Sequence, residues 1–251
     1  MSIVLEIQGV VKNFNGLKAL DDFSCSVQYG EILGLIGPNG AGKTTLFNII
    51  SGFLDPDFGT ILFKGKDIIN MSTHQIVNIG ISRTFQNLRL IYQISALENV
   101  LLSFKRQPGE QLRNVFFNWK HSLKQEKENR EEASLLINEV GLANKLNDPT
   151  ESLSYGQQKL LSLVCCFAAK SELVLLDEPV AGIAPEMTEK ILKIIQKLPT
   201  QGTTVIMIEH NIDAIMQVCD RIIFMDAGTK VSEGAPEAVK NDPRVIHAYI
   251  D

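Results

Sequence analysis

The sequence has no apolar run long enough to cross a bilayer. Its longest mostly apolar stretch, residues 160–169, is about half of the ~20 residues that a membrane-spanning helix needs. The first residues also lack a basic segment followed by an apolar one, so we expect no secretory signal. If the protein acts at a membrane, partner subunits must therefore hold it there.

The sequence is also poor in cysteine. Its four cysteines show neither the spacing of metal ligands nor the density of a disulfide scaffold. We therefore expect them to be small buried apolar side chains of a protein in a reducing cytosol. These residues are Cys25, Cys165, Cys166 and Cys219.

No segment concentrates positive charge. The 24 Lys and Arg residues are outnumbered by 29 Asp and Glu residues, and the formal net charge is −5. Surfaces that bind nucleic acid or anionic lipid need clustered Lys and Arg, so we expect neither a nucleic-acid partner nor direct contact with a bilayer. With 45% hydrophobic and 21% charged residues, the 251-residue chain has an ordinary globular composition and is expected to fold as one elaborated domain.

Short apolar runs alternate with helical patterns along much of the chain. Buried strands are expected at residues 32–36, 173–176 and 204–208, because each of these runs is continuously apolar or nearly so. After Pro185, apolar residues recur at helical spacing until Pro199 stops them. This alternation predicts an α/β fold with a mostly parallel sheet that is covered on both faces.

Two segments depart from that alternation. Near the N-terminus, the alternation over residues 4–10, with turn signals at residues 13–16 and 29–30, predicts short antiparallel strands. Residues 88–152 contain no strand-like run, and a charged stretch at 124–132 leads into an apolar pattern before Gly141, a candidate helix C-cap. We interpret this second segment as a helical insertion whose charges lie on a solvated helix face.

The residues from Gly37 to Thr44 match the G-x-x-x-x-G-K-[ST] pattern of a phosphate-binding loop. The loop follows a buried strand that ends at Ile36 and opens into a helical pattern. Its glycines let main-chain N–H groups converge on phosphates, and the helix presents its positive end to them. We predict that Lys43 reaches the β- and γ-phosphates and that the Thr44 hydroxyl ligates Mg²⁺. The candidate nucleotide-binding residues here are Gly37, Pro38, Asn39, Gly40, Ala41, Gly42, Lys43, Thr44 and Thr45.

A carboxylate pair, Asp177 and Glu178, follows the second buried strand. Ligands bind at the carboxyl ends of parallel strands in α/β sheets, so we predict that Asp177 holds Mg²⁺ and that Glu178 polarises the attacking water. The alternative is an ordinary strand end. His210 ends the third buried strand at the same edge of the sheet, where it is either catalytic or structural.

Taken in order, these motifs resemble those of the ABC ATPases. The sequence LSYGQ at residues 153–157 is similar to the LSGGQ signature that separates this family from other phosphate-loop proteins. Gln86 matches the family's Q-loop, and His210 matches its switch histidine. The resemblance spans nearly the whole chain.

The resemblance implies a single ABC ATPase domain over residues 1–251. A nucleotide-binding core with an antiparallel β subdomain would comprise residues 1–87 and 166–251, and a helical subdomain with the signature would comprise residues 88–165. Members of the family bind ATP with Mg²⁺ and hydrolyse it. Catalysis would then fall to Glu178, His210 and Gln86, and metal binding to Thr44, Gln86 and Asp177.

The resemblance also implies a head-to-tail dimer that closes over two ATP molecules. Ser154, Gly156 and Gln157 would meet the γ-phosphate that the other subunit holds, since the start of a helix favours anions. Without the family, Ser154 would be a plain helix cap. Phe14 matches the aromatic residue that stacks on adenine, although a core role for it is equally open. Gln86 would link the nucleotide to the surface that meets the membrane subunit.

Three residues depart from the family's pattern. Tyr155 replaces a glycine of the signature, but Gly156 is retained, so we expect its N–H contact to survive. Ala184 stands where many relatives carry aspartate, which would remove a cross-dimer contact. Cys165 stands where the signature helix often carries arginine, which leaves one polar contact of the family unaccounted for.

Three stretches resemble the ATP-binding subunits of importers for branched-chain and related amino acids: residues 83–90, the signature with tyrosine, and residues 233–239. Lipopolysaccharide-export ATPases and urea or amide importers resemble the chain over the same regions and stay as alternatives. The implied partners are integral membrane permease subunits and a second ATPase subunit, identical or not. The protein would lie at the cytoplasmic face of the cell membrane and contact it only through these partners.

Two further classes of function are open. Cytosolic ABC ATPases that act on DNA or the ribosome have a long coiled-coil insertion or two cassettes, neither of which this acidic sequence contains. A regulatory cassette would bind nucleotide without hydrolysing it. Intact Glu178 and His210 argue against that role, whereas Ala184 and Cys165 keep it open.

Overall fold

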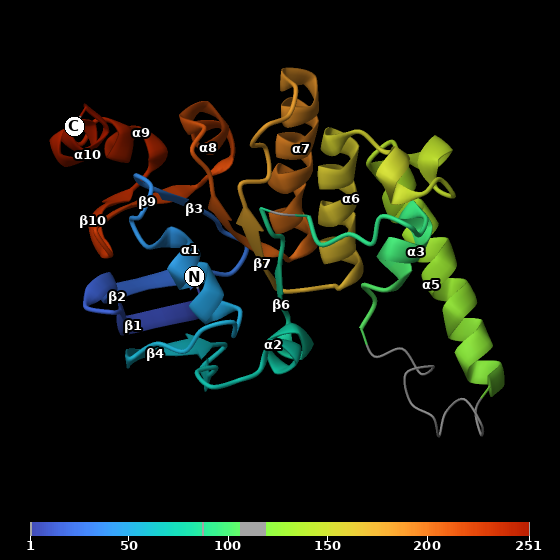
Figure 1. Ribbon diagram of the computed structural model, residues 1–251, viewed down its shortest axis with the longest axis horizontal. Coiled ribbons are helices and arrows are strands. Elements are labelled where there is room, and N and C mark those ends of the chain that lie inside the picture. Colours follow the sequence, from blue (N-terminus) through green and yellow to red (C-terminus); the bar gives the residue numbers. More distant parts are fainter. Residues whose placement is uncertain (1, 87, 106–118, 251) are drawn as a thin grey trace. The chain divides into compact units, whose positions relative to one another are not determined.

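The computed structural model describes residues 2–86, 88–105 and 119–250 (Figure 1). Part of the predicted helical insertion, residues 106–118, lies outside these described residues. So does Asn87, which belongs to one of the stretches that resemble amino-acid importers.

The chain forms two compact units. One consists of Met1–Gln86 together with Glu172–Asp251, and the other of Asn87–Ser171. The first unit therefore contains the phosphate loop, the acidic pair and His210, and the second contains the signature sequence. The assignment of these segments as subdomains of one ATPase domain, with the boundaries given above, stays a prediction.

The first unit is built on a six-stranded sheet in the order β10-β9-β3-β8-β7-β6. Five of these strands are parallel, and β10 is antiparallel to β9. The three predicted buried strands are confirmed as β3, β7 and β8, and every residue in them is buried. The strands are β3 (Ile32–Ile36), β6 (Ile81–Arg83), β7 (Leu173–Asp177), β8 (Thr204–Ile208), β9 (Arg221–Asp226) and β10 (Thr229–Gly234).

Helices cover both faces of this sheet, as predicted. Figure 1 shows α7 and α8 on one side of it and α1 on the other, toward β1 and β2. Residues of β3 face both sides of the sheet. Leu33 and Leu35 belong to the core cluster that includes buried residues of α1, whereas Gly34 lies against Ile215 of α8. The helices of the unit are α1 (Lys43–Ile50), α2 (Thr73–Ile79), α7 (Pro185–Lys197), the 3₁₀ turn Leu198–Gln201, α8 (Ile212–Val218), α9 (Pro236–Lys240) and α10 (Pro243–Ile250).

A second, antiparallel sheet of order β2-β1-β4-β5 completes the first unit. Its main hairpin turns at Asn15 and Gly16, which both have positive φ, as a tight hairpin turn requires. The prediction of short strands is wrong, because β1 and β2 each run for 12 residues. Several register shifts interrupt their pairing, so the simple alternation of the sequence does not continue along the long hairpin. The strands are β1 (Ile3–Phe14), β2 (Leu17–Gln28), β4 (Phe58–Phe63) and β5 (Lys66–Asp67).

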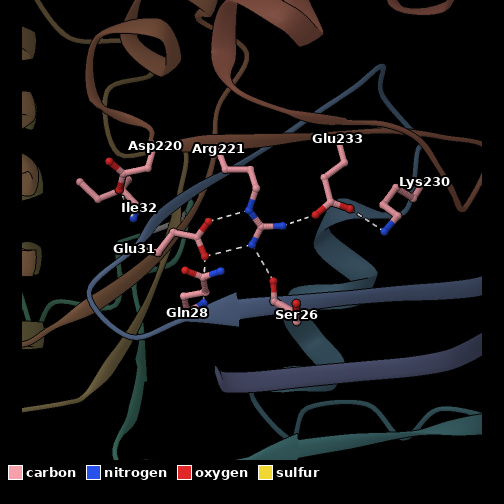
Figure 2. Close-up of polar contacts among 8 residues, drawn as sticks. All are labelled: Ser26, Gln28, Glu31, Ile32, Asp220, Arg221, Lys230 and Glu233. Carbon is pink, nitrogen blue, oxygen red and sulfur yellow. Dashed lines mark hydrogen bonds and ion pairs between the residues drawn. The ribbon is translucent and has the colours of Figure 1, made fainter. Parts of the chain in front are cut away.

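A half-buried ion network joins the two sheets at Arg221, the first residue of β9 (Figure 2). Its guanidinium donates to both carboxylate oxygens of Glu31, at 2.6 and 3.0 Å, and to the carbonyl oxygen of Ser26 at 2.6 Å. It also pairs with Glu233 of β10, which accepts a further hydrogen bond from Lys230. The hydrogen bonds to Glu31 raise the pKa of Arg221 above its ordinary value. One side chain thus connects β2, β9 and β10.

The second unit is helical in its described residues, which confirms the predicted insertion there. Helix α3 begins at a capping box of Ser95 and Glu98. Asn99 then connects the helix to two neighbouring segments, because it donates to the carbonyl oxygen of Ile91 and to the hydroxyl of Thr150, both at 2.9 Å. The elements are α3 (Ala96–Leu101), α5 (Trp119–Glu139), the 3₁₀ turns Ala143–Lys145 and Thr150–Ser152, and α6 (Tyr155–Ala168).

Within the described parts of the chain, no helix has the length and hydropathy that a membrane span requires. The four cysteines are free thiols, and three of them are buried while Cys165 is half-buried. Burial raises the pKa of the Cys25, Cys166 and Cys219 thiols to about 12 and that of Cys165 to about 11. The prediction of buried thiols is therefore confirmed for Cys25, Cys166 and Cys219, whereas Cys165 is only half-buried.

Replacing Arg221 by methionine should destabilise the first unit, because Glu31, only 10% exposed, would keep a buried charge without its partner. We expect the free energy of unfolding to fall by about 3 kcal/mol. The control is Lys18→Met, which removes an exposed pair with Asp21 and should cost less than about 1 kcal/mol. Urea denaturation followed by circular dichroism measures both, and equal losses would contradict the role of the network.

Candidate active site

The phosphate loop connects β3 to α1 through a backbone that favours glycine. Gly37, Gly40 and Gly42 have φ values of 146°, 84° and 95°. A Cβ atom on Gly37 would lie 2.0 Å from the carbonyl oxygen of Met225, and one on Gly42 would lie 2.3 Å from that of Ala19. Any other residue at these two positions would therefore clash with backbone that cannot easily move.

Helix α1 begins without a side-chain cap, since its N-cap is Gly42. By contrast, α2, α3 and α6 all begin with complete capping boxes. The first N–H groups of a helix need acceptors, and a helix that supplies none from its own N-cap side chain is suited to an external anion. No acidic residue lies in the first turn of α1 either, so nothing there would repel a phosphate.

Lys43 is the first residue of α1 and is almost buried, with 5% of its surface exposed. Its Nζ donates to the carbonyl oxygens of Gly37 and Pro38, at 2.7 and 2.9 Å. Burial lowers the pKa of Lys43, and the charges of Glu178 and Asp177 oppose that shift. The lysine thus lies folded onto the loop, where two carboxylates act on it electrostatically.

An open pocket of about 260 Å³ lies beside the loop. It brings together most of the predicted site residues of the first unit, including Gln86, Glu178 and His210 from three separate parts of the chain. Gly37, Pro38 and Asp177 do not line it, although the carbonyl oxygens of Gly37 and Pro38 accept hydrogen bonds from Lys43. The lining residues are Asn39, Gly40, Ala41, Gly42, Lys43, Thr44, Thr45, Gln86, Glu178, Ile208 and His210.

Glu178 lies between Gln86 and His210. One carboxylate oxygen accepts a hydrogen bond from Nε2 of Gln86 at 2.9 Å, and the other lies 3.2 Å from Nε2 of His210. The backbone of Glu178 has a φ of 50°, in the left-handed region that is unfavourable for a side chain of this kind. Strained backbone of this kind is common at functional sites. Here it accompanies a carboxylate oriented toward Gln86 and His210.

Asp177, the last residue of β7, is only 7% exposed. It is held by Arg83, a residue that the sequence analysis did not include in the site. Its Oδ2 accepts a hydrogen bond from Arg83 at 2.8 Å, and its N–H donates to the Thr84 hydroxyl at 3.1 Å. The sequence did contain a hint that Arg83 belongs to the site, because it is a charged residue only three positions before Gln86. Its partner, however, depends on β6 pairing with β7, a contact between segments far apart in the sequence.

The oxygen groups of this site suit Mg²⁺ together with a phosphate ligand. Thr44, Gln86, Asp177 and Glu178 offer hydroxyl, amide and carboxylate oxygens, which are the donors that Mg²⁺ prefers. Among the described residues, no group of three or more His, Cys, Asp or Glu side chains could hold a metal ion by itself. Mg²⁺ is commonly bound by one or two carboxylates plus substrate phosphates, so the residues present fit that arrangement.

Comparison with known proteins decides the family. A family profile described as "ABC transporter" matches residues 20–181, a segment that contains the phosphate loop, the signature and the acidic pair. The chain belongs to the ABC transporter family. The predicted resemblance is therefore confirmed.

Relatives of similar length support this assignment. The chain is 35% identical over 248 residues to the high-affinity branched-chain amino acid transport ATP-binding protein BraF of Pseudomonas aeruginosa, which covers 98% of this chain and 97% of that protein. It is 34% identical to LivG of Escherichia coli, a protein of the same description, with the same coverage. The ADP conformation of MJ1267, an ATP-binding cassette of an ABC transporter, matches with a TM-score of 0.85 and 33% identity over 100% of this chain and 99% of that one.

The predicted adenine-stacking residue of this ABC protein, Phe14, lies at the end of β1. It is 44% exposed, so its ring is available to a ligand, and Nζ of Lys12 lies 5.7 Å from the ring centre. Phe14 is not among the residues that line the pocket beside the phosphate loop. Its role in adenine stacking stays a prediction.

The ABC signature lies at the start of α6 in the second unit. Ser154 and Gln157 form a capping box: the Ser154 hydroxyl accepts from the Gln157 N–H at 3.4 Å, and Gln157 Oε1 accepts from the Ser154 N–H at 2.9 Å. Gly156 lies in the first turn of the helix, next to Tyr155, which is 46% exposed. Within one chain these residues cap a helix, and the predicted contact of Ser154, Gly156 and Gln157 with a partner's nucleotide stays a prediction.

The other two departures from the ABC pattern have local surroundings of their own. Sγ of Cys165 donates to the carbonyl oxygen of Asn99 at 3.6 Å, so the thiol makes a hydrogen bond within the second unit. Ala184 is the N-cap of α7 and provides no side-chain hydrogen bond there, while Pro185 occupies the first turn. Neither residue contributes a charged group.

Two of the three loop glycines, Gly40 and Gly42, provide a matched test. Both Gly40→Ala and Gly42→Ala force an alanine into a positive φ, at a cost of about 1–2 kcal/mol. A Cβ on Gly40 meets nothing within 4 Å, whereas one on Gly42 clashes with the backbone. We therefore expect Gly42→Ala to lose roughly 3–4 kcal/mol of unfolding free energy, measured without nucleotide. Equal losses in the two variants would contradict the described loop.

Proposed function

We propose that this chain is the ATP-binding and ATP-hydrolysing subunit of an ABC transporter that imports branched-chain or related amino acids. The pocket that gathers the phosphate loop, Gln86, Glu178 and His210 is the observation that carries the ATPase part of the proposal. The relatives named as branched-chain amino acid transport ATP-binding proteins support the transport part.

The phosphate loop would bind the triphosphate through main-chain N–H groups and the uncapped start of α1. Lys43 would exchange its two carbonyl partners for phosphate oxygens, which accept stronger, charge-assisted hydrogen bonds. Thr44, Asp177 and Gln86 would hold Mg²⁺, which when bound neutralises charge on the phosphates. Phe14 would stack on the adenine.

Glu178 would act as the base that orients and polarises the attacking water. It lies within hydrogen-bond reach of both Gln86 and His210, so these two residues can fix the carboxylate and respond to the γ-phosphate. Because both carboxylate oxygens already face a polar partner, we infer that at least one partner moves when water and nucleotide enter. Gln86 and His210 are therefore proposed as catalytic residues together with Glu178.

The working form is proposed to be a dimer of ATPase subunits. Ser154, Gly156 and Gln157 of one subunit would complete the nucleotide site of the other: although Ser154 and Gln157 cap α6 within one chain, the positive end of the helix dipole still favours an anion there. Integral membrane permease subunits would hold the dimer at the cytoplasmic face of the cell membrane. The relatives described as transport ATP-binding proteins support this assembly.

Replacing Glu178 by glutamine keeps the shape of the side chain and removes its basicity. We expect steady-state phosphate release from Mg-ATP to fall by roughly a hundredfold or more, since a general base contributes that much. ATP affinity, measured with a fluorescent analogue, should change by less than about threefold. The control is Glu237→Gln, which removes an equal charge at an exposed position on α9. Normal turnover in Glu178→Gln would refute the proposed base.

The transport assignment predicts a complex with membrane proteins. The tagged protein, purified from its native cells in mild detergent, should bring down integral membrane subunits. Vesicles that contain this complex should accumulate leucine, isoleucine or valine only when ATP is supplied on the side of the ATPase. Transport of urea or extraction of lipopolysaccharide would contradict the proposed substrate class. Co-sedimentation with ribosomes, without membrane proteins, would contradict transport itself.

A further inference from the structure

Arg83, the last residue of β6, connects three parts of the candidate site. One end nitrogen of its guanidinium donates to Asp177 Oδ2 at 2.8 Å. The other donates to Asn48 Oδ1 at 2.7 Å and to the Ser51 hydroxyl at 3.2 Å, which belong to α1 and its C-cap. Arg83 therefore links the carboxylate predicted to bind metal with the helix that carries the phosphate loop.

The guanidinium is buried and its plane is confined. The side chains of Arg83 and Asp177 are only 5% and 7% exposed. The centre of the guanidinium lies 5.4 Å from the ring of Phe47 and 5.0 Å from that of Phe85, distances typical of cation–π contact. The N–H donors of arginine lie in one rigid plane, so packing that fixes this plane also fixes the directions of its hydrogen bonds.

The residues that follow Arg83 bind the same end of β7. The N–H of Thr84 donates to the carbonyl oxygen of Leu175 at 2.9 Å, and the Thr84 hydroxyl accepts the N–H of Asp177. Gln86 then contacts Glu178. One short segment, residues 83–86, thus contacts both members of the acidic pair, and Arg83 is its charged member.

We propose that Arg83 is a positioning residue for Mg²⁺ binding, acting through Asp177. It holds one carboxylate oxygen and so fixes the orientation in which the other is offered to the metal. Without Arg83, a nearly buried carboxylate would lose the cation that holds it and would be free to turn away from the metal position. This inference rests on the proposed function above, because it assumes that Asp177 serves a Mg-ATP site.

The test is a Mg²⁺ titration of nucleotide binding, with a fluorescent non-hydrolysable ATP analogue as probe. In Arg83→Met we expect the Mg²⁺ concentration at half-saturation to rise at least about tenfold, a typical effect for a group that orients a metal ligand. Affinity for the probe in EDTA should stay within about threefold of wild type. Arg83→Lys, which restores the charge but not the fork, should give an intermediate Mg²⁺ requirement. In hydrolysis assays, saturating Mg²⁺ should recover most of the turnover.

Arg221→Met is the matched control, because it also breaks an arginine–carboxylate pair, whose side chains are 20% and 10% exposed (Figure 2). Arg221 begins β9 and pairs in register with Leu33, whereas the phosphate loop follows Ile36 at the other end of β3. We expect this variant to lose stability and keep the wild-type Mg²⁺ requirement. If Arg221→Met shifts that requirement as much as Arg83→Met does, the effect is general destabilisation and the proposal is wrong.

An unchanged Mg²⁺ requirement in Arg83→Met would also overturn the proposal. If that variant fails to fold, Asn48→Ala decides: it removes the 2.7 Å bond that holds the guanidinium and should raise the Mg²⁺ requirement in the same direction. An unchanged Mg²⁺ requirement in Asn48→Ala would overturn the proposal. A wild-type protein that binds no Mg-ATP would instead refute the proposed function, which separates the two failures.

Discussion

A backbone turn that requires glycine, between β3 and α1, is the constraint on which the site depends. Gly37 passes so close to the end of β9 that a single added carbon would lie 2.0 Å from the carbonyl oxygen of Met225. This approach lets the chain leave a fully buried strand and enter a helix whose first N–H groups have no side-chain cap. The cost of exposing those groups makes an anion at this point favourable.

The parallel sheet brings the remaining chemistry to the same place. Strands β7 and β8 lie side by side and end at Asp177 and Ile208, so Glu178 and His210 follow at one edge of the sheet. Edge strand β6 ends at Arg83 and is followed by Gln86, and these two residues contact the two carboxylates. Two acidic groups that would repel one another are thereby held by a cation and an amide from one short segment and by an imidazole from another.

The sequence was informative wherever the signal is local. The phosphate loop follows from residue spacing, and β3, β7 and β8 follow from continuous apolar runs, because strands buried on both faces have no polar alternation. Arg83 could not be assigned in this way, since its contact with Asp177 depends on the register between β6 and β7. The length of β1 and β2 was missed for a related reason: shifts in the register of their pairing interrupt the alternation that a sequence pattern needs. Contacts of the signature with a second subunit depend on a partner chain, so no single chain can contain them.

The decisive measurement follows the backbone amides of the phosphate loop by NMR while ATP and Mg²⁺ are added to ¹⁵N-labelled protein. We expect the resonances of Gly40, Gly42, Lys43 and Thr44 to shift most, and we expect Lys43→Ala to weaken or abolish that response. If ATP binds while these four amides stay unperturbed, the nucleotide lies elsewhere and the phosphate-loop site described above is wrong.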